Sequence, residues 1–96
     1  DYGTSVLAAA SGKVTFTGWR GGGGGYQVWI SHGNGIYTTY NHLSAITTST
    51  GAYVSKGTRI GRVGESGRST GSHLHFEVWR GAIWDGGYRV NPLKYF

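Results

Sequence analysis

The sequence predicts a small all-β domain, an antiparallel sheet folded around a groove. Glycine accounts for 19 of the 96 residues and aromatic residues for 15%, whereas charged residues make up only 14%. This composition favours many short strands joined by tight turns. No window repeats apolar residues at the i, i+3, i+4, i+7 spacing of an amphipathic helix. Short runs in which apolar and polar residues alternate occur instead, and they are typical of strands with one buried face.

Six segments bounded by Gly, Ser or Asn predict strands, which we expect to form a meander of antiparallel neighbours. They cover residues 6–10, 13–17, 26–31, 36–41, 59–63 and 73–80. The turn after the third segment contains Asn34-Gly35, a pair that accepts the positive φ angles of tight hairpins. Five consecutive glycines, 21–25, precede that segment. They lack the helix and the Lys-Ser or Lys-Thr pair of a phosphate-binding loop, so they predict either a flexible hairpin loop or the rim of a groove.

Length and charge limit the organisation and the partners of the chain. Residues 1–96 suffice for one domain with one modest core. No apolar run is long enough to span a membrane, and the absence of Cys excludes disulfides and thiolate metal ligands. Nine Lys and Arg against four Asp and Glu give a formal charge of +5, which favours an anionic partner. The basic residues are scattered and form no nucleic-acid-binding motif, so we do not expect nucleic acid to be that partner.

The most informative stretch for chemistry is 71–77, which contains His73, His75 and Glu77 within a predicted strand. Residues two apart in a strand share a face and lie about 6.5–7 Å apart, so these three side chains are expected on one face. Two imidazoles at this spacing allow one to bind a metal while the other contacts a water or substrate on it. Taken alone, the pair is also compatible with two histidines on the polar face of a strand.

Ordered motifs run along essentially the whole chain. They are Gly3-Thr4-Ser5-Val6, Gly12-Lys13-Val14, His32-Gly33-Asn34-Gly35, Thr39-Tyr40-Asn41-His42-Leu43-Ser44, Ser66-Gly67-Arg68-Ser69-Thr70-Gly71, His73-Leu74-His75-Phe76-Glu77 and Asn91-Pro92-Leu93. Together they resemble the lysostaphin-type (LytM-like) zinc metalloendopeptidases, which cut peptide cross-links in bacterial peptidoglycan. The combination of Tyr-x-His-Leu with His-Leu-His-Phe-Glu is the most specific part of the pattern.

The resemblance implies a role for three histidines. In that family the second His of the His-x-His pair is a zinc ligand, which implies that His75 binds zinc. It also implies that His73 and His42 are catalytic, acting on the attacking water and the developing oxyanion. Zinc lowers the pKa of a bound water towards about 7, and imidazoles can take up and return a proton near that pH. The implied activity is a zinc-dependent endopeptidase that cleaves cross-links or stem peptides of peptidoglycan by zinc-activated water with His assistance.

Other candidate residues are expected to be structural. Glu77 follows the His pair on a strand, whereas the Glu that serves as a base in His-Glu-x-x-His lies on a helix, so Glu77 is interpreted as a carboxylate that supports the site. His32, in the hairpin turn, is expected to be structural. The tryptophans are expected to be core or groove-wall aromatics: Trp19, Trp29, Trp79 and Trp84.

The chain departs from the family pattern at its start. The family's other two zinc ligands belong to a His-x-x-x-Asp motif before the segment that begins here at Gly3, so both would precede residue 1 and Asp1 would occupy a linker position. We therefore expect the C-terminal part of a longer domain or protein, whose upstream segment supplies those ligands. The alternative is a degenerate, non-catalytic module for cell-wall binding or for assembly in an envelope or phage tail. Both interpretations imply an extracellular, cell-envelope or virion-associated location.

Overall fold

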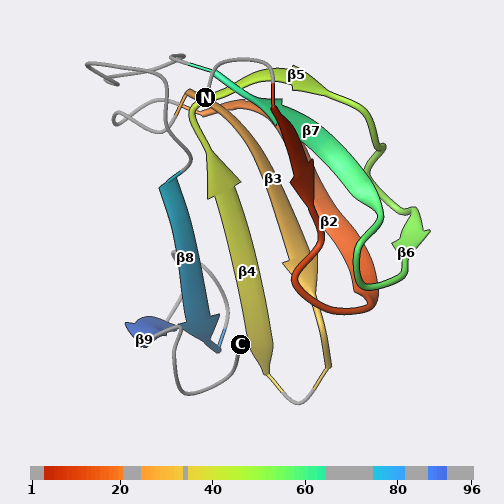
Figure 1. Ribbon diagram of the computed structural model, residues 1–96. Helices are drawn as coiled ribbons and strands as arrows, with labels where there is room; N and C mark the ends of the chain where they lie inside the picture. The colour runs from red at the N-terminus through yellow and green to blue at the C-terminus, as the bar shows by residue number, and fades with distance from the viewer. Residues whose placement is uncertain (1–3, 21–24, 34, 65–74, 82–86, 91–96) are drawn as a thin grey trace.

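The computed structural model describes residues 4–20, 25–33, 35–64, 75–81 and 87–90. Within these residues the chain forms nine strands and no helix, arranged in two antiparallel sheets (Figure 1). The strands are β1 (Ser5–Leu7), β2 (Gly12–Arg20), β3 (Gly25–Ser31), β4 (Ile36–Asn41), β5 (Leu43–Ile46), β6 (Tyr53–Val54), β7 (Arg59–Val63), β8 (His75–Arg80) and β9 (Tyr88–Val90). The larger sheet has the order β6-β2-β3-β4-β8-β9 and the smaller one β1-β7-β5. The predicted all-β fold is confirmed, and the described residues contain no helix that is long and apolar enough to cross a membrane.

The topology differs from the predicted meander. Among consecutive described strands, only β2–β3, β3–β4 and β8–β9 are neighbours; after β4 the chain enters the smaller sheet, and β8 later returns to pair with β4. β4 and β7 have the predicted bounds, whereas β5, β6 and β9 were not predicted. These three strands have two to four residues, which is too short for a pattern of alternation to stand out. Residues 73 and 74 of the last predicted strand lie outside the described residues.

Both predicted hairpins of the larger sheet are present. In the β3–β4 turn the amide of Ile36 donates to the carbonyl of Gly33 at 3.0 Å. Gly33 and Gly35 have φ angles of 85° and 75°, in the left-handed region that glycine tolerates, and Asn34 lies outside the described residues. β2 pairs with β3 up to Arg20 and Gly25, the last glycine of the run. The other four glycines, 21–24, predicted as a hairpin loop or a groove rim, lie outside the described residues.

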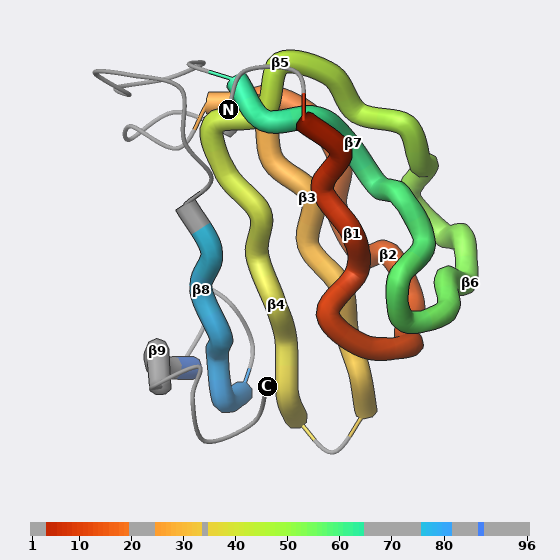
Figure 2. The backbone as a smooth tube through the Cα atoms, in the orientation of Figure 1, coloured from red at the N-terminus to blue at the C-terminus, as the bar shows by residue number. Residues whose placement is uncertain are grey.

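The hydrophobic core lies between the two sheets. In Figure 2 the smaller sheet crosses in front of β2 and β3 of the larger one. The buried cluster draws on both sheets: Val6, Ala8, Leu43, Ile60 and Val63 from the smaller sheet and its connections, and Val14, Val28, Ile30 and Tyr40 from the larger. Fully burying one such aliphatic side chain contributes about 1.5–3 kcal/mol, so this cluster is the main stabilising feature of the fold.

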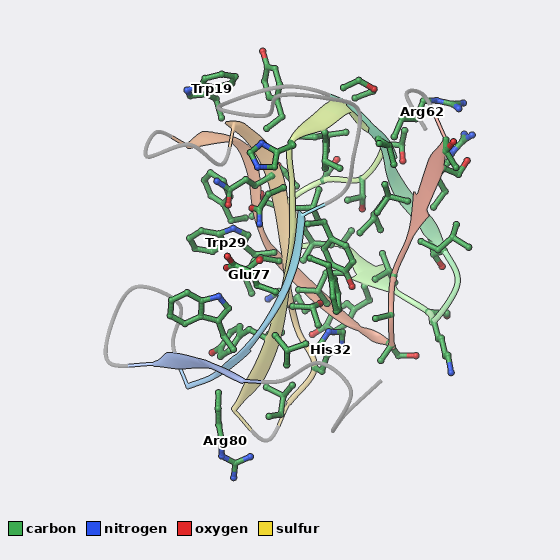
Figure 3. All side chains as sticks on the ribbon, turned by 60° about the vertical axis from the view of Figure 1, so that its left-hand side comes forward. Trp19, Trp29, His32, Arg62, Glu77 and Arg80 are labelled. Atoms are coloured by element: carbon green, nitrogen blue, oxygen red, sulfur yellow. The ribbon has the colours of Figure 1, made fainter. Side chains whose placement is uncertain are left out.

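The other side of the larger sheet, here called the outer face, carries polar and aromatic residues. On β8, Phe76 packs against the core cluster and Val78 is fully buried, as expected from alternation. Glu77 and Trp79 hence alternate onto the outer face. Figure 3 shows Glu77 and Trp29 close together on this side. Glu77, one of the residues singled out from the sequence, therefore lies on the outer face.

Candidate functional site

His42 forms the corner at which the chain leaves the larger sheet for the smaller one. It lies between the last residue of β4, Asn41, and the first residue of β5, Leu43. Its φ angle is 60°, the only positive value for a non-glycine residue in the described ranges. Histidine is one of the few non-glycine types enriched in this region. Tyr40 and Leu43, on either side, are buried in the core, which holds the corner in place, and His42 itself is 9% exposed.

Position 75 lies next to this corner. Asn41 is the register partner of His75 across β4 and β8. Register partners of an antiparallel pair belong to the same face, so position 75 falls in the outer-face row of Asn41. The structure therefore brings the backbone positions of His42 and His75 together at one end of the larger sheet. His73 lies outside the described residues, and its catalytic role stays a prediction.

A chain of hydrogen bonds on the outer face connects β8 to β4. Trp79 Nε1 donates to Glu77 Oε1 at 2.9 Å, and Thr39 Oγ1 donates to the same oxygen at 3.3 Å. Asn41 Nδ2 donates in turn to Thr39 Oγ1 at 3.3 Å. Thr39 and Asn41 are only 2% and 5% exposed. Glu77 is thus part of a supporting network, in agreement with its expected role.

The neighbouring strand β3 repeats part of this arrangement. Trp29 Nε1 donates to Gln27 Oε1 at 2.7 Å, as Trp79 does to Glu77, so Gln27-Val28-Trp29 and Glu77-Val78-Trp79 share the same local bond. The ring of Trp29 also packs on Phe16 of β2, with centroids 4.9 Å apart. Trp29 and Trp79 therefore each hold a polar side chain, Gln27 and Glu77, that lies two residues nearer to the His42 corner along the same strand.

His32 has the structural role expected from the sequence. Its Nδ1 donates to the carbonyl of Ser11 at 2.8 Å, and its Nε2 forms a 2.7 Å hydrogen bond with Thr38 Oγ1. Figure 3 places His32 well apart from Glu77, towards the β3–β4 turn. The ring ties the hairpin turn to the start of β2. It belongs to the scaffold and not to the candidate site.

Tyr40 anchors the core side of β4. Its hydroxyl accepts hydrogen bonds from the Ala9 amide and from Thr38 Oγ1, both at 2.9 Å. Burial raises the pKa of Tyr40 above its usual value of 10.0, although these two hydrogen bonds act in the opposite direction. The phenol therefore stays neutral in the folded protein across the physiological range. Its position fixes β4 directly before the His42 corner.

Trp19 differs from the other described tryptophans. It is 57% exposed and packs edge-to-face on Tyr26, which is 44% exposed, with ring centroids 5.1 Å apart. A core role is therefore wrong for Trp19, because this end of the β2–β3 hairpin extends beyond the core. Trp84 lies outside the described residues.

Comparison with known proteins identifies the family. The model of Peptidase family M23 matches residues 1–92. The chain belongs to family M23. The resemblance to lysostaphin-type and LytM-type enzymes is thereby confirmed.

The relatives of this M23 chain include peptidases, found both by sequence and by structure. The DD-carboxypeptidase/endopeptidase Mpg of Neisseria meningitidis serogroup B is 53% identical over 92 residues, which cover 96% of this chain and 20% of Mpg. The catalytic domain of the antimicrobial peptidase lysostaphin from Staphylococcus simulans superposes with a TM-score of 0.92 and 34% identity, over 99% of this chain and 71% of that one. The chain thus spans about one fifth of the length of Mpg.

The residues of this M23 chain fit part of a zinc site. A zinc-containing peptidase from Vibrio cholerae superposes with a TM-score of 0.74 and 37% identity, over 81% of this chain and 24% of that one. In the described part of the chain, no group of three or more His, Cys, Asp or Glu residues lies close enough together to hold a metal. Imidazole nitrogen is a preferred zinc ligand, so a histidine at position 75 fits zinc as one member of a ligand set.

Sequence reasoning missed Thr39, Asn41 and the indole of Trp79. The alternation within β4 and β8 contained a signal, since residues 39, 41, 77 and 79 all fall on the polar set of their strands. Their mutual contacts depend on the register of β4 against β8, which pairs Thr39 with Glu77. That register is a property of the fold and not of either strand alone.

Proposed function

We propose that this chain carries part of the active site of a zinc-dependent endopeptidase that cleaves cross-links or stem peptides of bacterial peptidoglycan. The observation that supports this most is the meeting of the His42 corner with position 75 at one end of the outer face. Membership of family M23 and the high structural similarity to the lysostaphin catalytic domain point to the same chemistry.

Each histidine has a distinct part in this proposal. His75 holds the zinc ion together with ligands from an upstream segment of the same protein. Zinc, when bound, polarises the scissile carbonyl and lowers the pKa of a water molecule. His42 and His73 exchange protons with the attacking water and the leaving amine and donate hydrogen bonds to the developing oxyanion. The left-handed corner at His42 presents its imidazole from a buried, fixed backbone, which favours a reproducible geometry.

The electrostatics suit a polyanionic substrate. The formal charge is +5, and Glu77 is the only carboxylate among the described residues. A cationic protein approaches an anionic wall polymer faster and is retained on it longer at low ionic strength. Because the proposed substrate is a cell-wall polymer, we also propose that the protein acts outside the cytoplasm, at the cell envelope or on a virion.

The decisive experiment measures zinc and hydrolysis together. We expect stoichiometric zinc, by elemental analysis, in the native protein that contains this chain, and release of soluble peptide from purified peptidoglycan. His75→Ala should lose both, whereas Gln27→Ala, on the same face of β3, should retain both. Binding to sacculi without zinc and without hydrolysis in the native protein would refute the enzyme and establish the alternative, a non-catalytic wall-binding or assembly module.

A further inference from the structure

The hydrogen bonds between β8 and β4 have a defined direction, because they end on a carboxylate. A carboxylate accepts hydrogen bonds and donates none, so Thr39 must use its single hydroxyl proton towards Glu77. The Thr39 oxygen is then left to accept, and Asn41 Nδ2 donates to it at 3.3 Å. Glu77 thereby orients the Thr39 hydroxyl, and that hydroxyl orients the amide of Asn41. The second donor to Glu77 Oε1, the Trp79 indole at 2.9 Å, holds the accepting oxygen itself in place.

The chain of hydrogen bonds reaches Asn41, directly before the corner residue. Asn41 is the last residue of β4, it is 5% exposed, and His42 follows with a φ angle of 60°. A buried amide cannot rotate away from its acceptor without leaving a donor poorly paired. On the far side of the corner, Leu43 is fully buried in the core. The backbone of His42 is therefore held from one side by core packing and from the other by a polar chain that starts at Glu77.

We propose that Glu77 is a positioning residue: acting through Thr39 and Asn41, it fixes the backbone at His42 and thereby the position from which the imidazole projects. This proposal rests on the catalytic role proposed above for His42. Glu77 does not exchange protons with the substrate in this scheme. The bond between Trp29 and Gln27 on β3 shows that an amide oxygen also accepts a hydrogen bond from an indole in this sheet. A glutamine at position 77 should therefore be able to replace the acceptor.

The test uses two matched substitutions at Thr39, in the native protein with zinc. Thr39→Val keeps the shape of the side chain and removes the hydroxyl; Thr39→Ser keeps the hydroxyl and removes the methyl group. We expect Thr39→Val to lower kcat about 10-fold with KM nearly unchanged, as is usual for partners that orient a reacting group. Thr39→Ser should stay within about twofold of the parent, because the hydrogen-bond chain persists.

A second readout does not depend on activity. In the zinc-free protein labelled with 15N-histidine, Thr39→Val should shift the ring and backbone signals of His42, and Thr39→Ser should not. The signals of this chain's four histidines are assigned by single substitutions, with His32, beyond the end of β3, as the internal reference. Glu77→Leu should reproduce Thr39→Val in both readouts, and Glu77→Gln should restore the parent values. If Glu77→Leu does not fold, the comparison of Thr39→Val with Thr39→Ser still tests the proposal.

The outcomes separate this inference from the proposed function. A parent protein that hydrolyses no peptidoglycan, but whose His42 signals move in Thr39→Val, would refute the proposed function and leave the link from Glu77 to His42 intact. An active parent in which Thr39→Val changes neither kcat nor the His42 signals would overturn the inference. So would a change in only one of the two readouts, since positioning requires both to move together.

Discussion

Strands β3 and β8 flank β4 on opposite sides and carry the same local bond with different consequences. On β3 an indole holds the amide of Gln27, and on β8 an indole holds the carboxylate of Glu77. Gln27 is 5% exposed, whereas Glu77 is half-buried and also receives the hydroxyl of Thr39 from β4. A carboxylate has more acceptor sites than an amide and no competing donor, so it can couple its strand to the next one. We infer from this comparison that β3 mainly stabilises the sheet, whereas β8 links the sheet to the candidate site.

The largest effect is expected next to the His42 corner, where a residue of β8 can be compared with one of β3. Position 75 on β8 and Gln27 on β3 lie on either side of Asn41, since Val28 pairs with Tyr40 and Asn41 with His75. We expect His75→Ala to lower the rate of peptidoglycan hydrolysis at least about a thousandfold, because loss of several kcal/mol of transition-state stabilisation costs tenfold per 1.36 kcal/mol. Gln27→Ala should leave kcat nearly unchanged. Similar losses in both variants, measured with the same substrate, would break the comparison.

A second test of the contrast between β3 and β8 exchanges their acceptor side chains, Gln27 and Glu77. Gln27→Glu places a carboxylate in a buried position, where desolvation raises its pKa above the value of about 4.3 in the unfolded chain. A raised folded pKa means that stability is retained below the unfolded pKa and lost as the pH rises through the folded one. We therefore expect Gln27→Glu to be about 1–3 kcal/mol less stable relative to the parent at pH 7 than at pH 4. Urea unfolding at both pH values provides the measurement.

The reciprocal change is the control for this exchange. Glu77→Gln keeps an oxygen for Trp79 and Thr39 and removes a half-buried charge, so its stability relative to the parent should vary much less between pH 4 and pH 7. If Gln27→Glu were as insensitive to pH as Glu77→Gln, the two positions would have the same environment. The proposed division between a stabilising β3 and a connecting β8 would then be wrong.

The parts of the fold that could be predicted from sequence are those with a local signal. Strands β4 and β7 were predicted with the correct bounds, because alternation and flanking turn residues mark both. The corner at His42 was not predicted. No pattern in the run Tyr40-Asn41-His42-Leu43 indicates that a residue with a left-handed backbone conformation separates two strands of different sheets. The return of β8 to pair with β4, which replaces the expected meander, is likewise decided by packing between distant segments.

Prediction of the candidate site from sequence is likewise limited to features with a local signal. The spacing within His73-Leu74-His75 and the Tyr-x-His-Leu motif pointed to His42 and His75, and the structure brings these two backbone positions together. The polar chain from Glu77 to Asn41 could not be predicted, because Thr39 and Glu77 are 38 residues apart and meet only in one register. A shift of that register by one residue would turn every one of these side chains to the other face.

The next prediction concerns the core face of the same central strand. Burial raises the pKa of Tyr40, so the stability that its neutral phenol contributes is complete below pH 10 and is lost as the pH rises through the folded value. Tyr40→Phe should be about 1 kcal/mol less stable at pH 8, since it loses the hydrogen bonds with Ala9 and Thr38. The free energies of unfolding of the parent and Tyr40→Phe should converge as the pH rises above 10. A constant difference over this range would show that β4 is not anchored by a neutral, buried phenol.

The smallest effect compares the two indoles directly. Trp29→Phe and Trp79→Phe remove the same N–H and the same part of the ring, but Trp79 is buried and Trp29 only partly so, which makes the loss of packing larger at Trp79. A hydrogen bond to a neutral amide contributes about 1 kcal/mol, and one to a carboxylate somewhat more, although partial exposure of Glu77 screens its charge. We expect Trp79→Phe to be about 0.5 kcal/mol more destabilising in urea unfolding than Trp29→Phe. Trp79→Phe alone should also lower kcat, because the oxygen it releases is the one that orients Thr39 and, through Asn41, the His42 corner. A fall in kcat in Trp29→Phe as well would mean that both flanking strands, and not β8 alone, transmit order to the site.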